Sequence, residues 1–307
     1  MKSNIDSRYT FKNFVIGASN ELACESAFAC AKNPSNAHIP LLIYGSTGLG
    51  KTHLLHAIGN EILENDPEAI VCYVHSEQFV NDLINALKTA KIAEFKSQYQ
   101  SVTALLIDDV QFFAGKERTQ EEFCHTFNSL LECKQRVIIT CDKFPKEVDG
   151  LESRLKSRLG WGLSVCIDPP DFKTRVAILQ KKSVQQGFNL SDDVANIIAE
   201  KIKSNARELE GALNTLWTNA SFMHVEISLD FTKKTLKELF NEDEIICNEV
   251  NIVFSHGKES GPWGSKITKM ADYAKTICEC KIHSLDYQDL NSPDERVERL
   301  VPKRLLL

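Results

Sequence analysis

The sequence has no apolar run that approaches the roughly 20 residues a membrane-spanning helix needs. Residues 1–13 are polar and lack the apolar centre of a secretory leader. The ten cysteines are scattered between Cys24 and Cys280 without the paired spacing of a disulfide framework. Together these absences predict a cytoplasmic protein with reduced thiols and no transmembrane segment.

An excess of positive charge is also missing, because 36 Lys and Arg residues face 42 Asp and Glu residues, a net charge of −6. This balance argues against a protein that coats nucleic acid by bulk electrostatics, so any such contact needs a local basic patch. A zinc site at Cys278 and Cys280 is disfavoured, since their spacing is too short for a usual zinc knuckle and no second pair accompanies them.

The most informative segment that is present is the run Gly-Ser-Thr-Gly-Leu-Gly-Lys-Thr at residues 45–52, which fits the phosphate-binding P-loop pattern. An apolar strand pattern at 40–44 precedes it and a helical pattern at 53–58 follows, a context that a chance glycine-rich turn would lack. We expect Lys51 to reach the β- and γ-phosphates of a nucleotide and the Thr52 hydroxyl to bind Mg²⁺. The residues expected to hold the nucleotide are Gly45, Thr47, Gly48, Leu49, Gly50, Lys51 and Thr52.

Four further apolar runs, at 70–74, 104–107, 137–140 and 163–167, are rich in β-branched residues. Helical patterns separate most of them, which predicts an α/β fold with a five-stranded parallel sheet flanked by helices. The segment Thr119–Glu122 fits a capping box and predicts the start of one of these helices.

A second chemical motif lies at the end of the 104–107 strand, where Asp108 and Asp109 follow an apolar run. In the Walker B arrangement the first acid holds the magnesium shell and the second polarises the attacking water. The alternative is two strand-end acids without a role, but the P-loop upstream favours the Walker B interpretation. Fast ATPases that carry these two motifs commonly have glutamate at the position of Asp109. The shorter side chain of Asp109 predicts slow hydrolysis, as in a nucleotide switch.

The strand patterns stop at residues 168–170, and two segments of different composition follow. Residues 171–240 predict an all-helical module with helices at 172–186, 191–203, 207–223 and 230–240, the second and last capped by Ser191 and Ser228. Residues 241–307 hold nine Lys and Arg against twelve Asp and Glu, a net charge of −3. This tail shows no helix-turn-helix pattern, and we expect a short strand at 248–254 and partial disorder.

The ordered set of motifs resembles the DnaA family of bacterial chromosomal replication initiators, within the AAA+ ATPases. The similarity runs from about Arg8 to Phe240 and is carried by the P-loop, the Walker B strand and the segments 9–17, 53–57, 106–113, 154–163 and 207–213. It implies an N-terminal tail at 1–7, an AAA+ core at 8–170, a helical lid at 171–240 and a divergent tail at 241–307.

The resemblance also implies roles for five residues outside the two motifs. Asp142 corresponds to sensor 1, and Arg207 corresponds to sensor 2, which reports the γ-phosphate from the lid. Arg158 corresponds to the arginine finger that reaches the nucleotide of a neighbouring subunit, with Arg154 beside it at the interface; surface ion pairing is the alternative for both. Val15 is expected near the adenine base, where it could equally be plain core.

Contact with single-stranded DNA is a further implication of the resemblance. Residues 76–99 are similar to the helical insertion found in initiators and helicase loaders. Ile84, Lys116 and Arg118 match positions that line the channel of the family's filament and touch single-stranded DNA. Lys116 and Arg118 are two cations that could contact phosphates. The alternative is that Lys116, Glu117 and Arg118 form an ordinary solvated loop.

The chain departs from the family in its terminal regions. Only a few residues precede the core, and nothing after Phe240 matches the basic helix-turn-helix domain that recognises duplex DNA boxes. The resulting hypothesis is a DnaA-like initiator of replication that binds ATP, assembles into a filament and engages single-stranded origin DNA, without support for duplex-box recognition. The alternatives are a regulatory or adaptor protein acting on a full-length initiator or the replicative helicase machinery, and a truncated initiator that retains only nucleotide binding.

Overall fold

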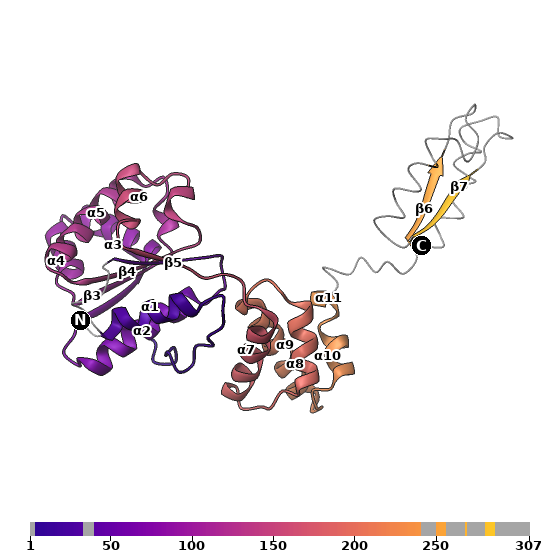
Figure 1. Ribbon diagram of the computed structural model, residues 1–307. Helices are drawn as coiled ribbons and strands as arrows, with labels where there is room; N and C mark the ends of the chain where they lie inside the picture. Colours follow the sequence, from indigo (N-terminus) through magenta and orange to yellow (C-terminus); the bar gives the residue numbers. More distant parts are fainter. Residues whose placement is uncertain (1–3, 33–39, 241–249, 256–267, 269–279, 286–307) are drawn as a thin grey trace. The chain divides into compact units, whose positions relative to one another are not determined.

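The computed structural model describes residues 4–32, 40–240, 250–255, 268 and 280–285 (Figure 1). The chain divides into two compact units, Met1–Leu239 and Phe240–Leu307. The first unit contains the P-loop, the Walker B strand and the helical module, and it therefore positions the candidate site.

A five-stranded, all-parallel sheet forms the centre of the first unit, as the sequence predicted. Its strands are β1 (Leu41–Tyr44), β2 (Val71–His75), β3 (Ala104–Asp108), β4 (Arg136–Cys141) and β5 (Leu163–Cys166). Their spatial order is β2-β3-β4-β1-β5, so the P-loop strand β1 lies between β4 and β5. Because all five strands run in one direction, their carboxyl ends meet at one edge of the sheet, where ligands bind in open α/β folds.

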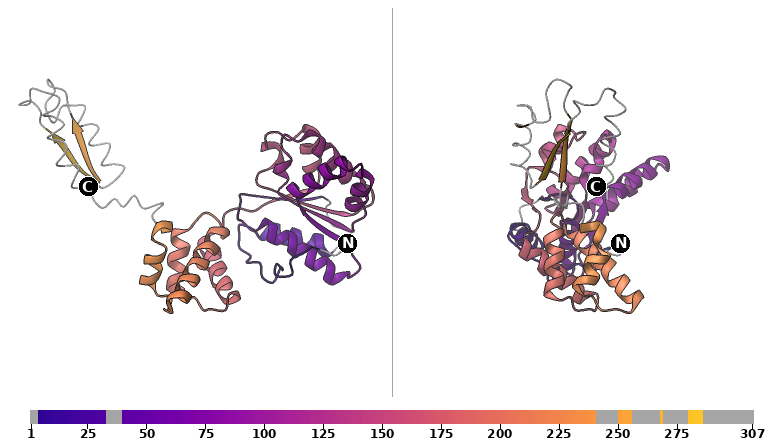
Figure 2. Two further views of the ribbon diagram at one scale, coloured as in Figure 1. Left: turned by 180° about the vertical axis from the view of Figure 1, so that it is seen from behind. Right: turned by 90° about the vertical axis from the view of Figure 1, so that its right-hand side faces the viewer.

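Helices cover both faces of this sheet (Figures 1 and 2). On one face lie α1 (Glu21–Lys32) and α2 (Lys51–Asn65); on the other lie α3 (Ser76–Lys88), α4 (Ile92–Gln100), α5 (Glu117–Glu132) and α6 (Ser153–Leu159). Successive strand residues alternate between the two apolar cores: Leu106 packs with the α1–α2 side, whereas Leu105 and Ile107 pack with the other. Burial on both faces explains why the strands appear in the sequence as nearly continuous apolar runs.

The start of α5 corrects one prediction. The capping box at Thr119–Glu122 is wrong, because α5 already begins at Glu117 after an N-cap residue, Lys116, that makes no side-chain cap bond. Thr119 lies inside the first turn and is only 6% exposed. Gln120 donates to the backbone carbonyls of Phe113 and Gly150, each at 3.0 Å. Tertiary contacts of the first turn therefore decide where this helix begins, rather than a local cap.

The helical module follows β5 and contains α7 (Phe172–Gln185), α8 (Asp192–Lys201), α9 (Ala206–Met223), α10 (Leu229–Thr235) and α11 (Lys237–Phe240). The single helix predicted at 230–240 is thus two short helices. Asp171 caps α7 and Ser228 caps α10, whereas Ser191 occupies the N-cap position of α8 without a side-chain cap bond. The amino end of α9 lies beside the P-loop, since the Arg207 N–H donates to the Gly48 carbonyl.

Within the described part of the second unit, β6 (Val250–Ser255) and β7 (Cys280–Leu285) pair in parallel. β6 corresponds to the strand predicted at 248–254. The predicted partial disorder of the tail and the zinc alternative at Cys278 lie outside the described residues. In the parts of the chain that the structure describes, no helix combines the length and apolarity needed to cross a bilayer.

Candidate nucleotide-binding site

The P-loop connects β1 to α2, and all three of its glycines have positive φ angles that favour glycine. Gly48 has φ +82° and Gly50 has φ +98°. A Cβ atom on Gly48 would lie 2.7 Å from the Asn205 side-chain oxygen, and one on Gly50 would lie 3.0 Å from the Phe14 ring. The loop therefore needs glycine both for its turn and for the close approach of the helical module.

Lys51, the first residue of α2, directs its ammonium group back into the curve of the loop. Its Nζ donates to the carbonyl of Gly45 at 2.7 Å and to that of Ser46 at 3.1 Å. It also forms an ion pair with Oδ1 of Asp142 at 2.7 Å, and the lysine side chain is only 6% exposed. The predicted P-loop cation and the predicted sensor 1 acid therefore meet directly.

Asp108 lies at the carboxyl end of β3 and is 2% exposed. Its Oδ2 accepts hydrogen bonds from the Thr52 hydroxyl at 2.7 Å and the Tyr73 hydroxyl at 3.0 Å. Its Oδ1 accepts from the Thr140 hydroxyl at 2.5 Å. Three neutral donors thus compensate the burial of this carboxylate. Thr52 was predicted from the P-loop and Thr140 belongs to the predicted sensor 1 strand end, whereas no sequence pattern pointed to Tyr73.

The donor chemistry around Asp108 suits magnesium. Mg²⁺ prefers oxygen ligands and is usually held by one or two carboxylates together with phosphates and water. Here the hydroxyl of Thr52 and the carboxylate of Asp108 converge beside the phosphate-binding loop. The Lys51 ammonium pairs with Asp142 and not with Asp108. In the described part of the chain, the hydrogen-bond partners of the Asp108 carboxylate are therefore all hydroxyl groups.

Asp109 is held in an unusual backbone conformation, with φ +60°. Its N–H donates to the Thr140 hydroxyl at 2.8 Å, and its carbonyl accepts from the Ser76 hydroxyl at 2.6 Å. Its carboxylate accepts from Nε2 of Gln111 at 3.1 Å and lies 3.3 Å from Nε2 of His75. Backbone strain maintained by several partners is typical of functional positions.

Gln111 also donates to Oδ2 of Asp142 at 2.8 Å, so one amide bridges the second Walker B acid and the sensor 1 acid. Neither Gln111 nor His75 was predicted to be a site residue. Each follows or ends a strand at the carboxyl edge of the sheet, which is the signal that would have identified them.

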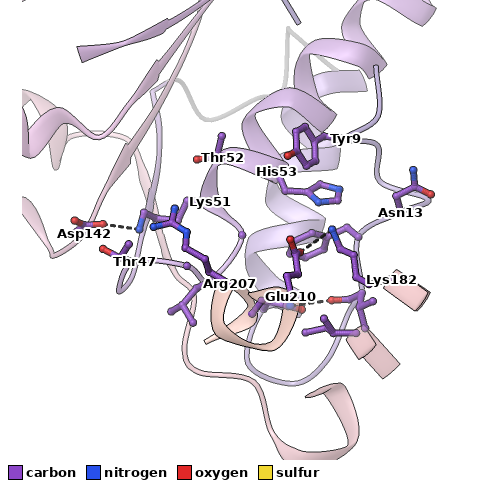
Figure 3. Close-up of a pocket in the computed structure, with 18 of the residues that line it drawn as sticks. Tyr9, Asn13, Thr47, Lys51, Thr52, His53, Asp142, Lys182, Arg207 and Glu210 are labelled. Atoms are coloured by element: carbon purple, nitrogen blue, oxygen red, sulfur yellow. Dashed lines mark hydrogen bonds and ion pairs between the residues drawn. The ribbon is translucent and has the colours of Figure 1, made fainter. Parts of the chain in front are cut away.

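A cavity of about 260 Å³ lies between the sheet edge and the helical module (Figure 3). Lys51, Thr52, Asp109 and Asp142 line it, whereas Asp108 is outside the lining and contacts it through Thr52. Thr47, Lys51 and Asp142 lie together at one end, and the Arg207 side chain extends toward them from α9 (Figure 3). Apolar side chains, namely Phe14, Val15 and Ile178, also line the cavity, as a base would require. The remaining lining residues that the sequence analysis missed are Tyr9, Asn13, Asn20, His53, Lys182, Ala206 and Glu210.

Two of the missed residues form an ion pair inside the helical module, with Lys182 Nζ 2.8 Å from Oε1 of Glu210. Burial lowers the pKa of a third, His53, to about 4, although its contact with the Thr10 carbonyl opposes this shift. His53 is therefore neutral at physiological pH, and its Nε2 lies 2.9 Å from that carbonyl. The positive charge in the cavity lining that could attract an anionic ligand consequently comes from Lys51, Lys182 and Arg207.

The helical module contacts the P-loop directly. The backbone N–H of Arg207 donates to the Gly48 carbonyl at 3.2 Å. Asn205 caps α9 by accepting from the Glu208 N–H at 2.9 Å, and this fixes the start of the helix that carries Arg207. Lys181 donates to the Phe14 carbonyl at 3.3 Å, which ties the module to the segment before α1.

The other predicted functional residues lie outside the cavity lining. Arg154 and Arg158 are exposed on α6, whose opposite side buries Leu155 and Leu159. Ile84 is exposed on α3, and Arg118 is exposed in the first turn of α5. Lys116 is also exposed and donates to the Phe112 carbonyl at 2.6 Å. A surface position is what contact with a neighbouring subunit or with a nucleic acid requires.

Comparison with known proteins identifies the family. The family model described as the bacterial DnaA ATPase domain matches residues 5–166. Domain III of the replication initiation protein DnaA from Thermotoga maritima is 39% identical, with a TM-score of 0.75, and the match covers 77% of this chain and 98% of that one.

Two further structures extend the comparison. A replication initiator DnaA bound to AMPPCP and single-stranded DNA is 33% identical, with a TM-score of 0.63 and coverage of 77% of this chain and 82% of that one. A RuvB variant from Thermotoga maritima is only 17% identical, with a TM-score of 0.56 and coverage of 77% and 75%, and supports the fold alone. The chain therefore belongs to the DnaA family of replication initiators, and its fold is that of an AAA+ P-loop ATPase.

Proposed function

We propose that this chain is an ATP-dependent initiator of chromosomal replication that binds magnesium–ATP between its core and its lid and acts in the cytoplasm. One observation supports this most strongly: the Lys51–Asp142 pair, Thr52 and Arg207 line a single cavity, and Thr52 donates directly to Asp108. A phosphate loop, an acidic metal site and a cation from the lid are the parts that a nucleotide-sensing ATPase needs.

Each part has a separate task in this proposal. Lys51 and the loop N–H groups bind the phosphates, and Thr52 and Asp108 hold the magnesium ion, which supplies charge neutralisation at the phosphates. Asp109 orients the attacking water and accepts its proton, while the Gln111 amide holds the Asp109 and Asp142 carboxylates in position relative to each other. Val15 contacts the base, and Arg207 reports the γ-phosphate to the lid.

Slow hydrolysis is part of the proposal. The carboxylate of Asp109 reaches one methylene less far than a glutamate would, and it is already engaged by Gln111 and His75. A water positioned by such a group is activated less efficiently, so the ATP-bound state persists. A long-lived ATP state suits a switch that controls assembly rather than a motor.

Assembly and DNA contact use the exposed residues. Arg158, with Arg154 beside it, would reach the nucleotide of the next subunit and build an ATP-dependent filament. Ile84, Lys116 and Arg118 would contact single-stranded origin DNA, as the bound DNA of the related initiator supports. The acidic balance of residues 241–307 favours neither duplex-box recognition nor an independent duplex interaction.

The same acidic tail keeps a second candidate function open: an adaptor that contacts a full-length initiator or the replicative helicase machinery through the AAA+ core. A truncated initiator with nucleotide binding alone is the third candidate. Binding of single-stranded DNA distinguishes the lead proposal from both.

The test of the proposed function is binding of a labelled single-stranded oligonucleotide, at stated salt, with and without ATP. We expect ATP to increase the affinity of the wild-type chain, and the double variant Lys116→Ala/Arg118→Ala to lose at least tenfold in affinity, because two phosphate-contacting cations are removed.

The matched control is Lys233→Ala/Lys234→Ala, which removes the same charge from two exposed positions of α10. It should bind the oligonucleotide like the wild type. ATP-independent binding, or equal losses in both double variants, would contradict the proposed DNA contact. Strong preference for a duplex initiator box would instead show that the tail carries a function we do not assign to it.

Arg207→Ala tests the lid contact. We expect turnover of ATP to fall by about tenfold or more while the affinity for ATP changes less, because a cation aimed at the γ-phosphate stabilises mainly the charge that develops in the transition state. The backbone contact from residue 207 to Gly48 remains in the variant, so the lid should still dock. Equal losses of affinity and turnover, measured side by side, would show that Arg207 only holds ground-state ATP.

A further inference from the structure

β2 is not part of either nucleotide-binding motif, yet it supplies a hydroxyl to the Walker B carboxylate. Tyr73 pairs in register with Leu106, two residues before Asp108 on the neighbouring strand. Because side chains alternate along a strand, Tyr73, Leu106 and Asp108 lie on the same face of the sheet. A long side chain reaches such a diagonal neighbour, and the Tyr73 hydroxyl donates to Oδ2 of Asp108 at 3.0 Å.

The Tyr73 side chain is held in this position from two directions. Its ring packs against the His56 ring of α2, with centroids 4.2 Å apart, and Nδ1 of His56 accepts from the Asp6 N–H at 3.2 Å. Its backbone is fixed by the Asn4 side chain, which accepts from the Tyr73 N–H and donates to the Tyr73 carbonyl. These contacts therefore hold the Tyr73 hydroxyl in position to donate to Asp108.

Among the described contacts, Oδ2 of Asp108 has two donors, Thr52 and Tyr73, while Thr140 serves Oδ1. Thr52 is also expected to bind magnesium through its hydroxyl oxygen, so the position of its bond to Oδ2 would depend on the metal, whereas the Tyr73 hydroxyl serves Oδ2 alone.

We propose that Tyr73 is a positioning residue of the magnesium site, whose hydroxyl keeps the Asp108 carboxylate oriented when Thr52 engages the metal. The inference rests on the proposed magnesium–ATP site. Groups that hold a metal ligand from outside typically change metal affinity by ten- to a hundredfold when removed. Tyr73 should therefore govern how much Mg²⁺ the chain needs, rather than how well it binds nucleotide without metal.

The test is a titration of Mg²⁺ against the full chain and the ATP analogue AMPPCP, with nucleotide binding as the readout. Tyr73→Phe keeps the ring and its packing on His56 but removes the donor. We expect the half-saturating Mg²⁺ concentration to rise about tenfold. In excess EDTA the affinity of the variant for AMPPCP should equal that of the wild type.

Tyr99→Phe is the matched control, because the Tyr99 hydroxyl donates to Oδ2 of Asp82 at 2.5 Å and the residue is 1% exposed. It removes an equivalent buried bond away from the nucleotide cavity, and its Mg²⁺ requirement should match the wild type. An unchanged Mg²⁺ requirement in Tyr73→Phe would overturn the proposal. So would equal losses of affinity in Mg²⁺ and in EDTA, since Tyr73 would then only support the fold.

These outcomes are separable from failure of the proposed function. If the wild-type chain does not bind AMPPCP at saturating Mg²⁺, the nucleotide site itself is wrong. If the wild type binds and requires Mg²⁺ but Tyr73→Phe behaves like Tyr99→Phe, the site stands and only the role of Tyr73 is refuted.

Discussion

Replacing Lys51 with alanine should reduce the affinity for ATP by at least a hundredfold, which corresponds to about 2.7 kcal/mol. The ammonium group is the cation enclosed by the P-loop, and charge-assisted contacts to phosphate are among the strongest hydrogen bonds. Its present partners, the carbonyls of Gly45 and Ser46 and the Asp142 carboxylate, cannot replace that positive charge. Equilibrium titration with a fluorescent ATP analogue measures the loss.

The fold should survive this substitution, because the Asp142 side chain is 34% exposed and can be solvated when its partner is removed. Circular dichroism and thermal unfolding of the variant provide the check. Lys88→Ala, at an exposed position in the last turn of α3, is the control for loss of a lysine and should bind ATP normally. Unchanged affinity in Lys51→Ala would refute the P-loop assignment.

Replacing Arg158 with alanine should abolish ATP-dependent assembly while leaving the ATP affinity of the monomer within about twofold of the wild type. Arg158 is exposed on α6 and is absent from the cavity lining of its own chain, so its proposed partner is the nucleotide of a neighbouring subunit. An arginine supplied across an interface stabilises charge on the γ-phosphate, and its loss removes the link between ATP and assembly.

Sedimentation velocity with ATP and with ADP measures this effect across protein concentrations. Lys173→Ala, at an exposed position in the first turn of α7, is the control for a lost surface charge and should assemble like the wild type. ATP-driven oligomers of Arg158→Ala with the wild-type size distribution would show that Arg158 is only a surface cation. A parallel loss of ATP affinity would place Arg158 in its own nucleotide site instead.

Much of the fold was predictable because its signals are contiguous in the sequence. The central strands β1, β3 and β4 are short apolar runs buried on both faces, and the P-loop and the Walker B acids directly follow two of these runs. The five strands of the sheet begin and end within a residue of the predicted ones, whereas β6 begins two residues after the predicted start and β7 was not predicted. Errors arose where distant contacts decide local structure, as at the start of α5, where Gln120 bonds to Phe113 and Gly150.

The sequence by itself determined the sheet, the phosphate loop and the acidic strand end, because a few neighbouring residues specify each of them. Only the tertiary structure decided which side chains complete the site. Tyr73, 35 positions from Asp108 in the sequence, meets it because the parallel register of β2 and β3 places both on one face. Arg207 meets the P-loop because Gly48, without a Cβ, lets the lid approach. Such contacts depend on strand register and on module packing, and no local sequence pattern encodes either.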